Sequence, residues 1–548
     1  MKAVLLTAAC STESALAYVA QPRTEDAQCR QTTVAILGAG VAGITAAQAL
    51  VNASVTDFVI IEANDYIGGR IANVDFGRQS NGDPHKVEIG ANWVHGVGGN
   101  FVNPIHHLIE KYNINLVSPD YETHLTFNET GPITIDDLWD AYDEVSEEAI
   151  AEAGRLLTEN VQDESTRTGL ALAGWKPETD DMAAALVEWV NFDWSIAVPP
   201  EDSSFIFGTT VENFTYGLFG EDEPFIVESR GYNTIVKGEA STFLHQTNDP
   251  RLLLNTTVTN ITHSDTGVTI HSSDGTCISA AYAINTVSLG VLQHDSITYH
   301  PSLPLWKQTA IQSFGMTTYT KLFLQFNSSW WDPNNTNTEY FYYADPHQRG
   351  FYPVFQSLST PKYLGSDSHI LFATVTGSQS HRVERQSDAE TQAEIMHVLQ
   401  SMFPNATIPE PTAFYYPRWT LTPNFRGSYS YWPPQVTLKS HQNLRANVGR
   451  LYFAGEHVST QFYGYLHGSW YSGREMGERV AGLLGKKECE GRGGKEEGGC
   501  GELVHYDVLE GETGEEELVL GNGWSVDSVA LEELEGGTGR EDPFNLEE

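Results

Sequence analysis

Near the N-terminus, the spacing of apolar residues changes twice. Residues 33–37 form a short apolar run of the kind that a buried strand requires. Residues 41–51 then have apolar side chains at helical spacing, at Ile44, Ala47, Leu50 and Val51. Residues 58–62 return to a short apolar run. The pattern predicts a strand, a helix and a second strand, which is the order of a βαβ unit.

Later segments alternate between strand and helix patterns, without an internal repeat. Residues 252–270 predict a hairpin, with Gly267 in its second half. Residues 391–403 predict a helix because their apolar side chains share one face, at Ile395, Met396, Val398, Leu399 and Met402. We therefore expect an α/β protein with mixed sheets.

The two ends of the chain differ from the region between them. Lys2, the apolar stretch 3–10 and the small residues before Gln21 predict a signal peptide over residues 1–20. The alternative is a disordered N-terminus, since the apolar stretch is short. A leader of 31 residues in all precedes the compact region. Residues 486–548 contain 19 acidic and 5 basic residues, and we expect a disordered acidic tail there.

Glycosylation motifs support export from the cell. Asn-x-Ser/Thr sequons occur along the whole compact region, at Asn52, Asn128, Asn213, Asn255, Asn260, Asn327, Asn334 and Asn405. The five cysteines show no metal-ligand spacing and no dense disulfide framework. Cys489 and Cys500 could form a disulfide in an oxidising compartment, although the sequence does not establish one. We predict a secreted glycoprotein.

The composition restricts the partners. Seventy-two acidic residues against 31 Lys and Arg give a net charge of −41, which repels nucleic acid and favours cationic ligands. An equally good explanation of the negative charge is that it only keeps the protein soluble. No apolar run has the length of a membrane helix, so no membrane partner is expected. The oligomeric state is not predicted.

A glycine motif lies between the first predicted strand and the helix. Residues 38–43 read Gly-Ala-Gly-Val-Ala-Gly, and the acidic Glu62 ends the second strand. Gly38 permits a tight turn, Gly40 lets the backbone approach a pyrophosphate, and Gly43 permits close packing of helix and strand. The helix N-terminus attracts phosphates, and Glu62 can accept hydrogen bonds from ribose hydroxyls. This predicts a dinucleotide site.

Three further segments favour FAD over NAD. Residues 67–70, Ile-Gly-Gly-Arg, place Arg70 where it can pair with a phosphate. Residues 90–96 read Gly-Ala-Asn-Trp-Val-His-Gly. In residues 451–457, a strand runs into Glu456, an acid that can meet the ribityl chain of a flavin.

Together these segments resemble the flavin-containing amine oxidase family, and most closely its polyamine oxidases. The likeness extends from about residue 34 to about residue 482. Further blocks carry it: Ser288–Leu292, Tyr319–Lys321, Pro417–Trp419, Gly427–Ser430, Ala454–His457 and Gly464–Gly468. The order and spacing of these blocks are specific, whereas no single block is.

The resemblance implies the fold. A Rossmann-like FAD-binding domain would be assembled from residues 32–105, 230–290 and 415–485. A mixed α+β substrate-binding domain would comprise residues 106–229 and 291–414. The active site would lie at their junction, under the flavin ring. Non-covalent FAD is expected, because residues 456–475 lack the cysteine to which monoamine oxidases attach their flavin.

The resemblance also implies residue roles. Lys321 matches a lysine that holds a water near the flavin, and Tyr429 and Tyr465 match an aromatic pair that flanks the substrate amine. His95 completes the implied catalytic set. The residues expected at the cofactor are Gly38, Gly40, Gly43, Glu62, Ala63, Gly69, Arg70, Ala91, Asn92, Trp93, Val258, Trp419, Glu456 and Leu466.

Two positions depart from the pattern of some polyamine oxidases. His95 stands where those enzymes have a glutamate, and Ser195 stands where they have a second acid. Other polyamine oxidases do carry a histidine at the first position. The departures leave open which polyamine is preferred and which carbon is oxidised. A neutral or partly protonated histidine would tolerate an acetylated substrate end.

The implied activity is oxidation of polyamines such as spermine, spermidine or their acetyl derivatives by O2. The products would be an aldehyde, a shorter amine and hydrogen peroxide. Two alternatives remain: another amine oxidase, acting on monoamines or L-amino acids, and a non-catalytic FAD-binding protein. An amino acid oxidase needs an arginine for the substrate carboxylate, for which Arg418 and Arg426 are candidates.

Overall fold

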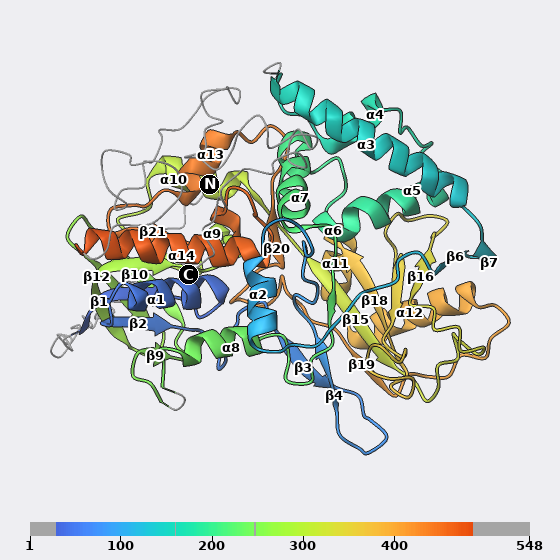
Figure 1. Ribbon diagram of the computed structural model, residues 1–548, viewed down its shortest axis with the longest axis horizontal. Coiled ribbons are helices and arrows are strands. Elements are labelled where there is room, and N and C mark those ends of the chain that lie inside the picture. The colour runs from blue at the N-terminus through green and yellow to red at the C-terminus, as the bar shows by residue number, and fades with distance from the viewer. Residues whose placement is uncertain (1–28, 159–160, 246–247, 486–548) are drawn as a thin grey trace, which may run out of the picture.

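The computed structural model describes residues 29–158, 161–245 and 248–485. The predicted signal peptide and acidic tail lie outside these residues. Figure 1 shows two lobes side by side, with α1 (Val41–Asn52) and α14 (Leu466–Leu483) in the first and β15 (Tyr319–Gln325) and β18 (Ile370–Thr376) in the second. Within the described ranges, no helix has the length and hydrophobicity needed to cross a membrane.

An eight-stranded sheet forms the centre of the first lobe. Its strand order is β13-β10-β11-β12-β1-β2-β9, and β21 also pairs with β12. The strands are β1 Arg30–Leu37, β2 Phe58–Ile61, β9 Leu252–Leu253, β10 Val258–His263, β11 Val268–Ser272, β12 Cys277–Asn285, β13 Thr298–His300 and β21 Leu451–Phe453. The strands β2, β1, β12 and β21 are parallel, so their carboxyl ends meet at one edge. In open α/β sheets, ligands bind at that edge.

Helices α1 and α14 pack against each other through small residues. A Cβ on Gly477 would lie only 2.5 Å from the Ala46 carbonyl oxygen, and one on Gly473 would overlap the Ala42 carbonyl. The two helix backbones therefore approach closely. This contact holds the N-terminal glycine motif beside a segment more than 400 residues later in the chain.

The second lobe contains a seven-stranded sheet and a group of helices. The strand order is β19-β15-β18-β17-β16-β6-β7. The other strands are β6 His124–Asn128, β7 Gly131–Ile133, β16 Tyr340–Tyr343, β17 Val354–Ser357 and β19 Ala413–Tyr415. The helices are α3 Asp136–Thr158, α4 Thr166–Leu172, α5 Met182–Glu188, α6 Trp194–Ile196, α7 Phe205–Phe219, α11 Gly377–Glu384 and α12 Asp388–Met402. A π-helical turn, η1 (Trp189–Asp193), joins α5 to α6.

Shorter elements connect the lobes and cover the sheets. The helical ones are α2 Pro104–Lys111, α8 Thr234–Ser241, α9 Leu289–Gln293, α10 Leu305–Ser313, α13 Leu438–Arg445 and the 3-10 turn η2 Glu456–Val458. The strands are β3 Asn73–Phe76, β4 His85–Glu88, β5 Leu116–Val117, β8 Phe225–Ile226, β14 Gly315–Thr317 and β20 Tyr429–Tyr431.

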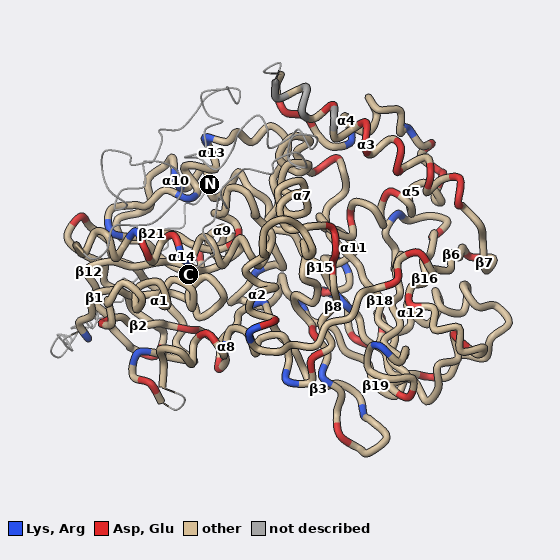
Figure 2. The backbone as a smooth tube through the Cα atoms, viewed as in Figure 1, with Lys and Arg blue, Asp and Glu red and all other residues tan. Residues whose placement is uncertain are grey.

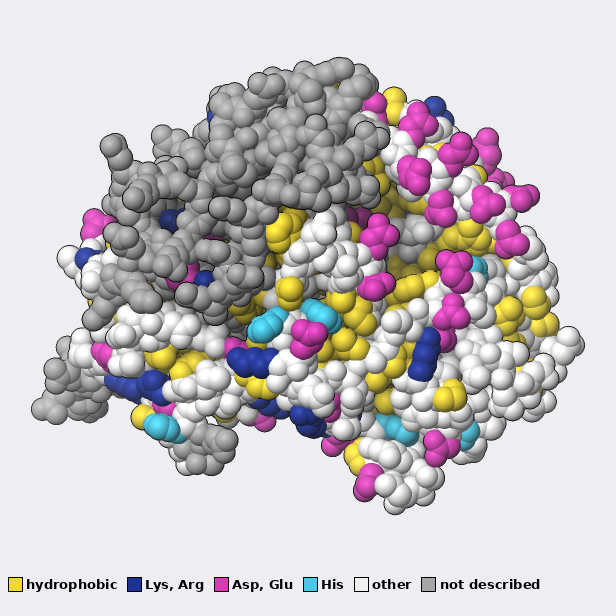
Figure 3. Space-filling view, in the orientation of Figure 1, with side chains coloured by type: hydrophobic (Ala, Val, Ile, Leu, Met, Phe, Trp, Pro, Cys, Tyr) yellow, Lys and Arg dark blue, Asp and Glu magenta, His cyan; other side chains and the backbone are white. Residues whose placement is uncertain are grey.

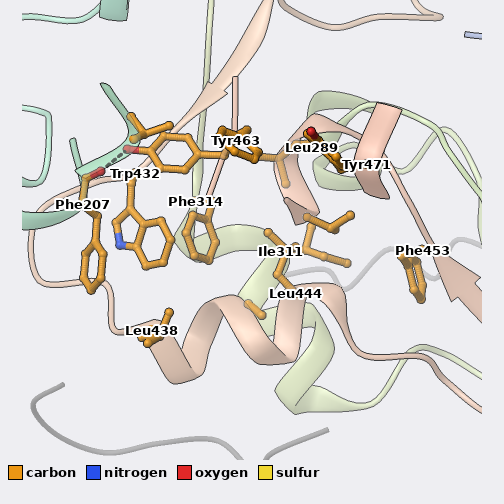
Figure 4. Close-up of a cluster of buried hydrophobic side chains, with 14 of the residues drawn as sticks. Phe207, Leu289, Ile311, Phe314, Trp432, Leu438, Leu444, Phe453, Tyr463 and Tyr471 are labelled. Carbon is orange, nitrogen blue, oxygen red and sulfur yellow. Dashed lines mark hydrogen bonds between the residues drawn. The ribbon is translucent and has the colours of Figure 1, made fainter. Parts of the chain in front are cut away.

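One hydrophobic core continues across both lobes. It includes side chains of β1 and β12 in the first lobe and of α3 and α7 in the second. Figure 4 shows the part of this core where Phe207 of α7 and Trp432 meet Tyr463. The Phe207 and Trp432 rings stack with centroids 4.1 Å apart, and the Tyr463 hydroxyl donates to the Phe207 carbonyl at 2.8 Å. The junction between the lobes is therefore well packed.

The predicted βαβ unit and the later helix are present. Strand β1 begins three residues before the predicted start, because Arg30 to Thr32 also pair with β12. The leader is therefore shorter than 31 residues. Helix α12 likewise begins before residue 391, because Ser387 and Glu390 form a capping box at its N-terminus.

The prediction of one hairpin over residues 252–270 is wrong in its extent. β9 is a separate strand that pairs in parallel with β2, and the hairpin consists of β10 and β11 alone. Gly267 lies in its turn, where its carbonyl accepts from the Ser264 amide at 3.0 Å. Strand β13 also joins the first sheet, although residues 298–300 fall in the range expected for the substrate-binding domain.

A disulfide that the sequence did not predict joins Cys29 to Cys277. The two cysteines are 248 positions apart, so no local spacing indicated the pair. They become neighbours because the start of β1 pairs with the start of β12. Cys489 and Cys500, the pair considered from the sequence, lie outside the described residues.

Candidate active site

A cavity of about 1140 Å³ lies at the junction of the two lobes. On one side it is lined at the carboxyl ends of the four parallel strands, at Leu37, Ile61, Thr286 and Gly455. On the other side it is lined by the region of η1, α6 and α7. Its volume is above the roughly 300–1,000 Å³ typical of ligand pockets, so it has room for more than one small ligand.

At two positions of the 38–43 motif, the surrounding protein leaves no room for a side chain. Gly38 has a φ of +112°, and a Cβ there would lie 2.5 Å from the Thr286 Oγ1. A Cβ on Gly43 would overlap the Gly38 carbonyl oxygen. These two positions therefore shape the turn and the start of α1, as the motif predicts.

Gly40 is different, because nothing in the protein requires a glycine there. Its φ of −73° suits any residue, and the nearest atom to an added Cβ would be the Gly69 Cα at 4.0 Å. At Gly43, Gly90 and Gly473, which also lack a positive φ, such a Cβ would lie within 3.0 Å of a protein atom. Gly40 lines the cavity, so the empty space beside it is ligand space.

Glu62 anchors the glycine turn. Its Oε2 accepts from the Ala39 amide at 2.7 Å, and its Oε1 accepts from the Asn64 amide at 2.8 Å. The carboxylate is buried and also lines the cavity. Glu62 therefore lies where a ribose would meet the turn.

An ion pair joins two predicted motifs that are far apart in sequence. Arg70 Nη1 donates to Glu456 Oε1 at 2.8 Å and to the Ser428 carbonyl at 2.8 Å. Burial opposes ionisation of Glu456, but the charge of Arg70 holds its pKa below the usual value. Both side chains line the cavity, and a phosphate contact of Arg70 stays a prediction.

The cavity brings together nearly all residues predicted at the cofactor. Besides Gly38, Gly40, Glu62, Arg70 and Glu456, its lining includes Ala63, Gly69, Ala91, Asn92, Trp93, Val258, Trp419 and Leu466. Gly43 is the exception, because it lies behind the turn and has the packing role described above.

Lys321 is buried in the middle of β15 and does not itself line the cavity. Its Nζ donates to Asn92 Oδ1 at 3.0 Å and lies 5.4 Å from the centre of the Trp93 ring. Both contacts are cavity residues, so Lys321 is one side chain away from the ligand space. Burial lowers the pKa of Lys321, and the charge of Glu88 partly offsets this effect.

The two predicted tyrosines line the same cavity from different elements. Tyr429 lies on β20, and its hydroxyl donates to the Ser195 carbonyl at 2.7 Å. Tyr465 precedes α14, and its ring centre lies 5.1 Å from that of His95. Burial raises the pKa of both phenols well above the usual value, so both are neutral. Ser195 thus acts at this site through its backbone.

His95 has partners that the sequence did not indicate. Its Nδ1 lies 2.7 Å from Glu223 Oε1, and the Tyr216 hydroxyl also donates to that carboxylate oxygen. Glu212, one helical turn before Tyr216 on α7, lines the cavity as well. In the sequence, the only indication that Glu212 and Tyr216 act together was their four-residue spacing, which places them on one helix face.

The charge of the cavity wall is strongly negative. Of the residues that line it in the described part of the chain, Arg70 is the single Lys or Arg, and Glu456 already pairs with it. The acidic lining residues are Glu62, Glu122, Asp143, Glu212, Glu221, Glu223 and Glu456. Figure 2 shows acidic residues along α3, and Figure 3 shows them gathered on the surface of that region. The cavity is suited to a cationic ligand.

Comparison with known proteins identifies relatives along most of the chain. Residues 41–481 match the family described as flavin containing amine oxidoreductase. The chain is 37% identical over 476 residues to polyamine oxidase 1 of Zea mays, covering 83% of this chain and 92% of that protein. It is 36% identical over 452 residues to polyamine oxidase 7 of Oryza sativa subsp. japonica, covering 80% and 93%.

The fold also has a solved counterpart. A mutant of putrescine oxidase, redesigned in its cofactor binding, superimposes with a TM-score of 0.64 at 18% sequence identity. The match covers 83% of this chain and all of that one. At this identity the likeness concerns the fold.

Proposed function

The chain belongs to the flavin-containing amine oxidoreductase family, and we propose that it oxidises polyamines with O2, using non-covalent FAD. O2 takes up two electrons and two protons to become hydrogen peroxide, and one water hydrolyses the oxidised C–N bond to give an aldehyde and a shorter amine. The observation that carries the substrate class is the negative cavity, in which no Lys or Arg except Arg70 lines the wall of the described residues. The similarity to polyamine oxidases over most of both chains supports the same class.

The residues of the cavity fit FAD. The space beside Gly40 and the first turn of α1, which has no side-chain cap, suit a pyrophosphate. Glu62 would bind the ribose, and Glu456, which lines the same cavity, would meet the ribityl chain. When bound, the flavin supplies the redox chemistry, accepting electrons from the amine and passing them to O2.

Side chains from both lobes position the substrate. The neutral rings of Tyr429 and Tyr465 form apolar walls whose faces attract a cationic amine, and they fix its approach. The lowered pKa of Lys321 makes its neutral form accessible, so Nζ can hold or accept a proton while its hydrogen bond to Asn92 Oδ1 fixes its position. We assign His95 to the substrate amine that is not oxidised.

The wall also argues against an amino acid substrate. Such a substrate needs an arginine for its carboxylate, and neither Arg418 nor Arg426 lines the cavity. Arg418 instead pairs with Asp388 at 2.7 Å. A carboxylate in this cavity would face carboxylates, which disfavours the amino acid oxidase alternative.

A panel of amines tests the proposal. We expect purified holoenzyme to release hydrogen peroxide with spermine, spermidine or their acetyl forms, and far less with tyramine or leucine. Anaerobic addition of the active amine should bleach the flavin absorbance, which a non-catalytic FAD-binding protein would not show. Peroxide release with tyramine or leucine alone would overturn the polyamine assignment.

We also propose that the protein is exported and N-glycosylated. The Cys29–Cys277 disulfide is of a kind that persists in oxidising compartments. Seven of the eight sequon asparagines are exposed or half-buried, whereas Asn213 is buried in α7. The sequon at Asn213 is therefore excluded as a glycan site in the folded protein.

Peptide mapping after enzymatic glycan removal checks this distribution. In protein from a secreting eukaryotic host, we expect conversion of asparagine to aspartate at exposed sequons such as Asn327 and Asn405, and none at Asn213. A glycan on Asn213 would contradict the burial argument. Retention of the protein inside the cell would contradict export.

A further inference from the structure

At the two motif positions where some polyamine oxidases have an acid, this chain has none. The fold instead brings two acids from another segment of the chain to the cavity. His95 and Ser195 occupy the motif positions, but Glu212 of α7 and Glu223, just after α7, both line the cavity near His95. We infer that Glu212 and His95, which Glu223 orients, bind the remote ammonium group of the substrate, the one that is not oxidised. This inference rests on the proposed function and specifies its substrate: a polyamine with a free terminal ammonium.

The position of Glu223 depends on the turn that ends α7. Gly220 follows the helix with a φ of +95°, and a Cβ there would overlap the backbone amide of Gly99. The turn reverses the chain, so that Glu223 reaches back to the Tyr216 hydroxyl. Glu223 is therefore held in place by backbone geometry and by a hydrogen bond from the helix.

Glu223 in turn orients His95. Because its Oε1 lies 2.7 Å from His95 Nδ1, that nitrogen carries the proton. In the neutral imidazole, Nε2 is then an acceptor, which is what an ammonium N–H requires. Burial alone would raise the pKa of Glu223, but its interaction with His95 and the hydrogen bonds from His95 and Tyr216 keep it below the usual value. Glu223 is thus a positioning residue that stays negative.

Glu212 is the carboxylate without a partner. Within the described ranges, no hydrogen bond or ion pair engages its side chain, and the charges that act on it are those of Glu223 and His95. Burial, reinforced by repulsion from Glu223, raises its pKa to about 7. Such a carboxylate in a cavity wall lacks a counter-charge, which a substrate ammonium supplies.

The carboxylates near His95 change the substrate preference that a histidine alone would give. A histidine alone tolerates an acetylated end, but a histidine that contacts Glu223 and shares the cavity wall with Glu212 does not favour it. An acetyl group removes the positive charge and leaves Glu212 unpaired in the wall. The enzyme should therefore discriminate in favour of the unacetylated polyamine.

Steady-state kinetics of Glu212→Gln test the inference with two matched substrates. Spermine has both terminal ammonium groups, whereas N1,N12-diacetylspermine keeps only the inner amines. We expect KM for spermine to rise at least about tenfold with kcat within about twofold, because one charged hydrogen bond is lost. KM for the diacetyl form should stay within about twofold. The exposed Glu410→Gln is the matched control and should leave both values unchanged.

A second measurement does not depend on the variant being stable. In the wild-type holoenzyme, 1,8-diaminooctane should inhibit at least about tenfold more tightly than 1-aminooctane, since only the diamine has a remote ammonium. Equal inhibition by the two amines, or equal effects of Glu212→Gln on both substrates, would overturn the inference. A wild-type enzyme that oxidises no polyamine would instead overturn the proposed function.

Discussion

Gly40→Leu is expected to give a folded protein that purifies without flavin. The new side chain meets no protein atom closer than about 4 Å at its Cβ, so the fold has room for it. It would fill the space that the pyrophosphate needs. Overpacking of a filled site costs on the order of 3 kcal/mol, which corresponds to a loss of FAD affinity of at least about a hundredfold.

The flavin absorbance per protein and the melting temperature together check this expectation. Gly40→Leu should melt as the wild-type apoprotein does, and added FAD should not raise its melting temperature. Gly43→Leu is the matched contrast, because its side chain would overlap the Gly38 carbonyl and should prevent folding. A yellow Gly40→Leu protein with a full complement of FAD would remove the glycine turn from the cofactor site.

Lys321→Met should keep its flavin and lose at least about tenfold in turnover. Nζ lies directly behind Asn92 of the cavity wall and can hold a proton, and proton-handling side chains contribute about 10²–10⁴-fold. Methionine has a similar length and needs no counter-charge in this buried position. We therefore expect a melting temperature equal to or above that of the wild type.

The comparison of kcat, flavin spectrum and melting temperature separates a chemical role from a structural one. Lys176→Met serves as the control, because Lys176 is exposed and distant from the cavity lining. If Lys321→Met turned over at the wild-type rate, Lys321 would have no part in the reaction. If it lost flavin as well as activity, its role would be to support the Asn92 segment.

Local patterns were sufficient wherever one element or one turn carried the information. The βαβ unit was predicted from the apolar residues alone. A helix that buries one face has apolar residues at helical spacing, and a fully buried strand is a short apolar run. The roles of Gly38 and Gly43 follow from their places in the motif, and added Cβ atoms at both would clash. The resemblance of the separate blocks indicated the family, which the comparisons confirm.

Errors arose where the partner of a segment is distant. Residues 252–253 resemble a hairpin strand, but they pair with β2, some 190 positions earlier. Cys29 and Cys277 show no spacing signal, because only the pairing of β1 with β12 makes them neighbours. The phosphate contact of Arg70 stays a prediction, but its ion pair with Glu456, 386 positions later, was not predicted from the sequence.

The sequence by itself determined the type of elements, the glycine turn and most of the residues that line one side of the cavity, because each depends on a short stretch of chain. The tertiary structure alone decided the environment of those residues. It placed Lys321 behind Asn92 and brought Glu212 and Glu223 to His95. Electrostatic environment depends on distances through space, and no periodicity along the chain records which carboxylates share a cavity wall.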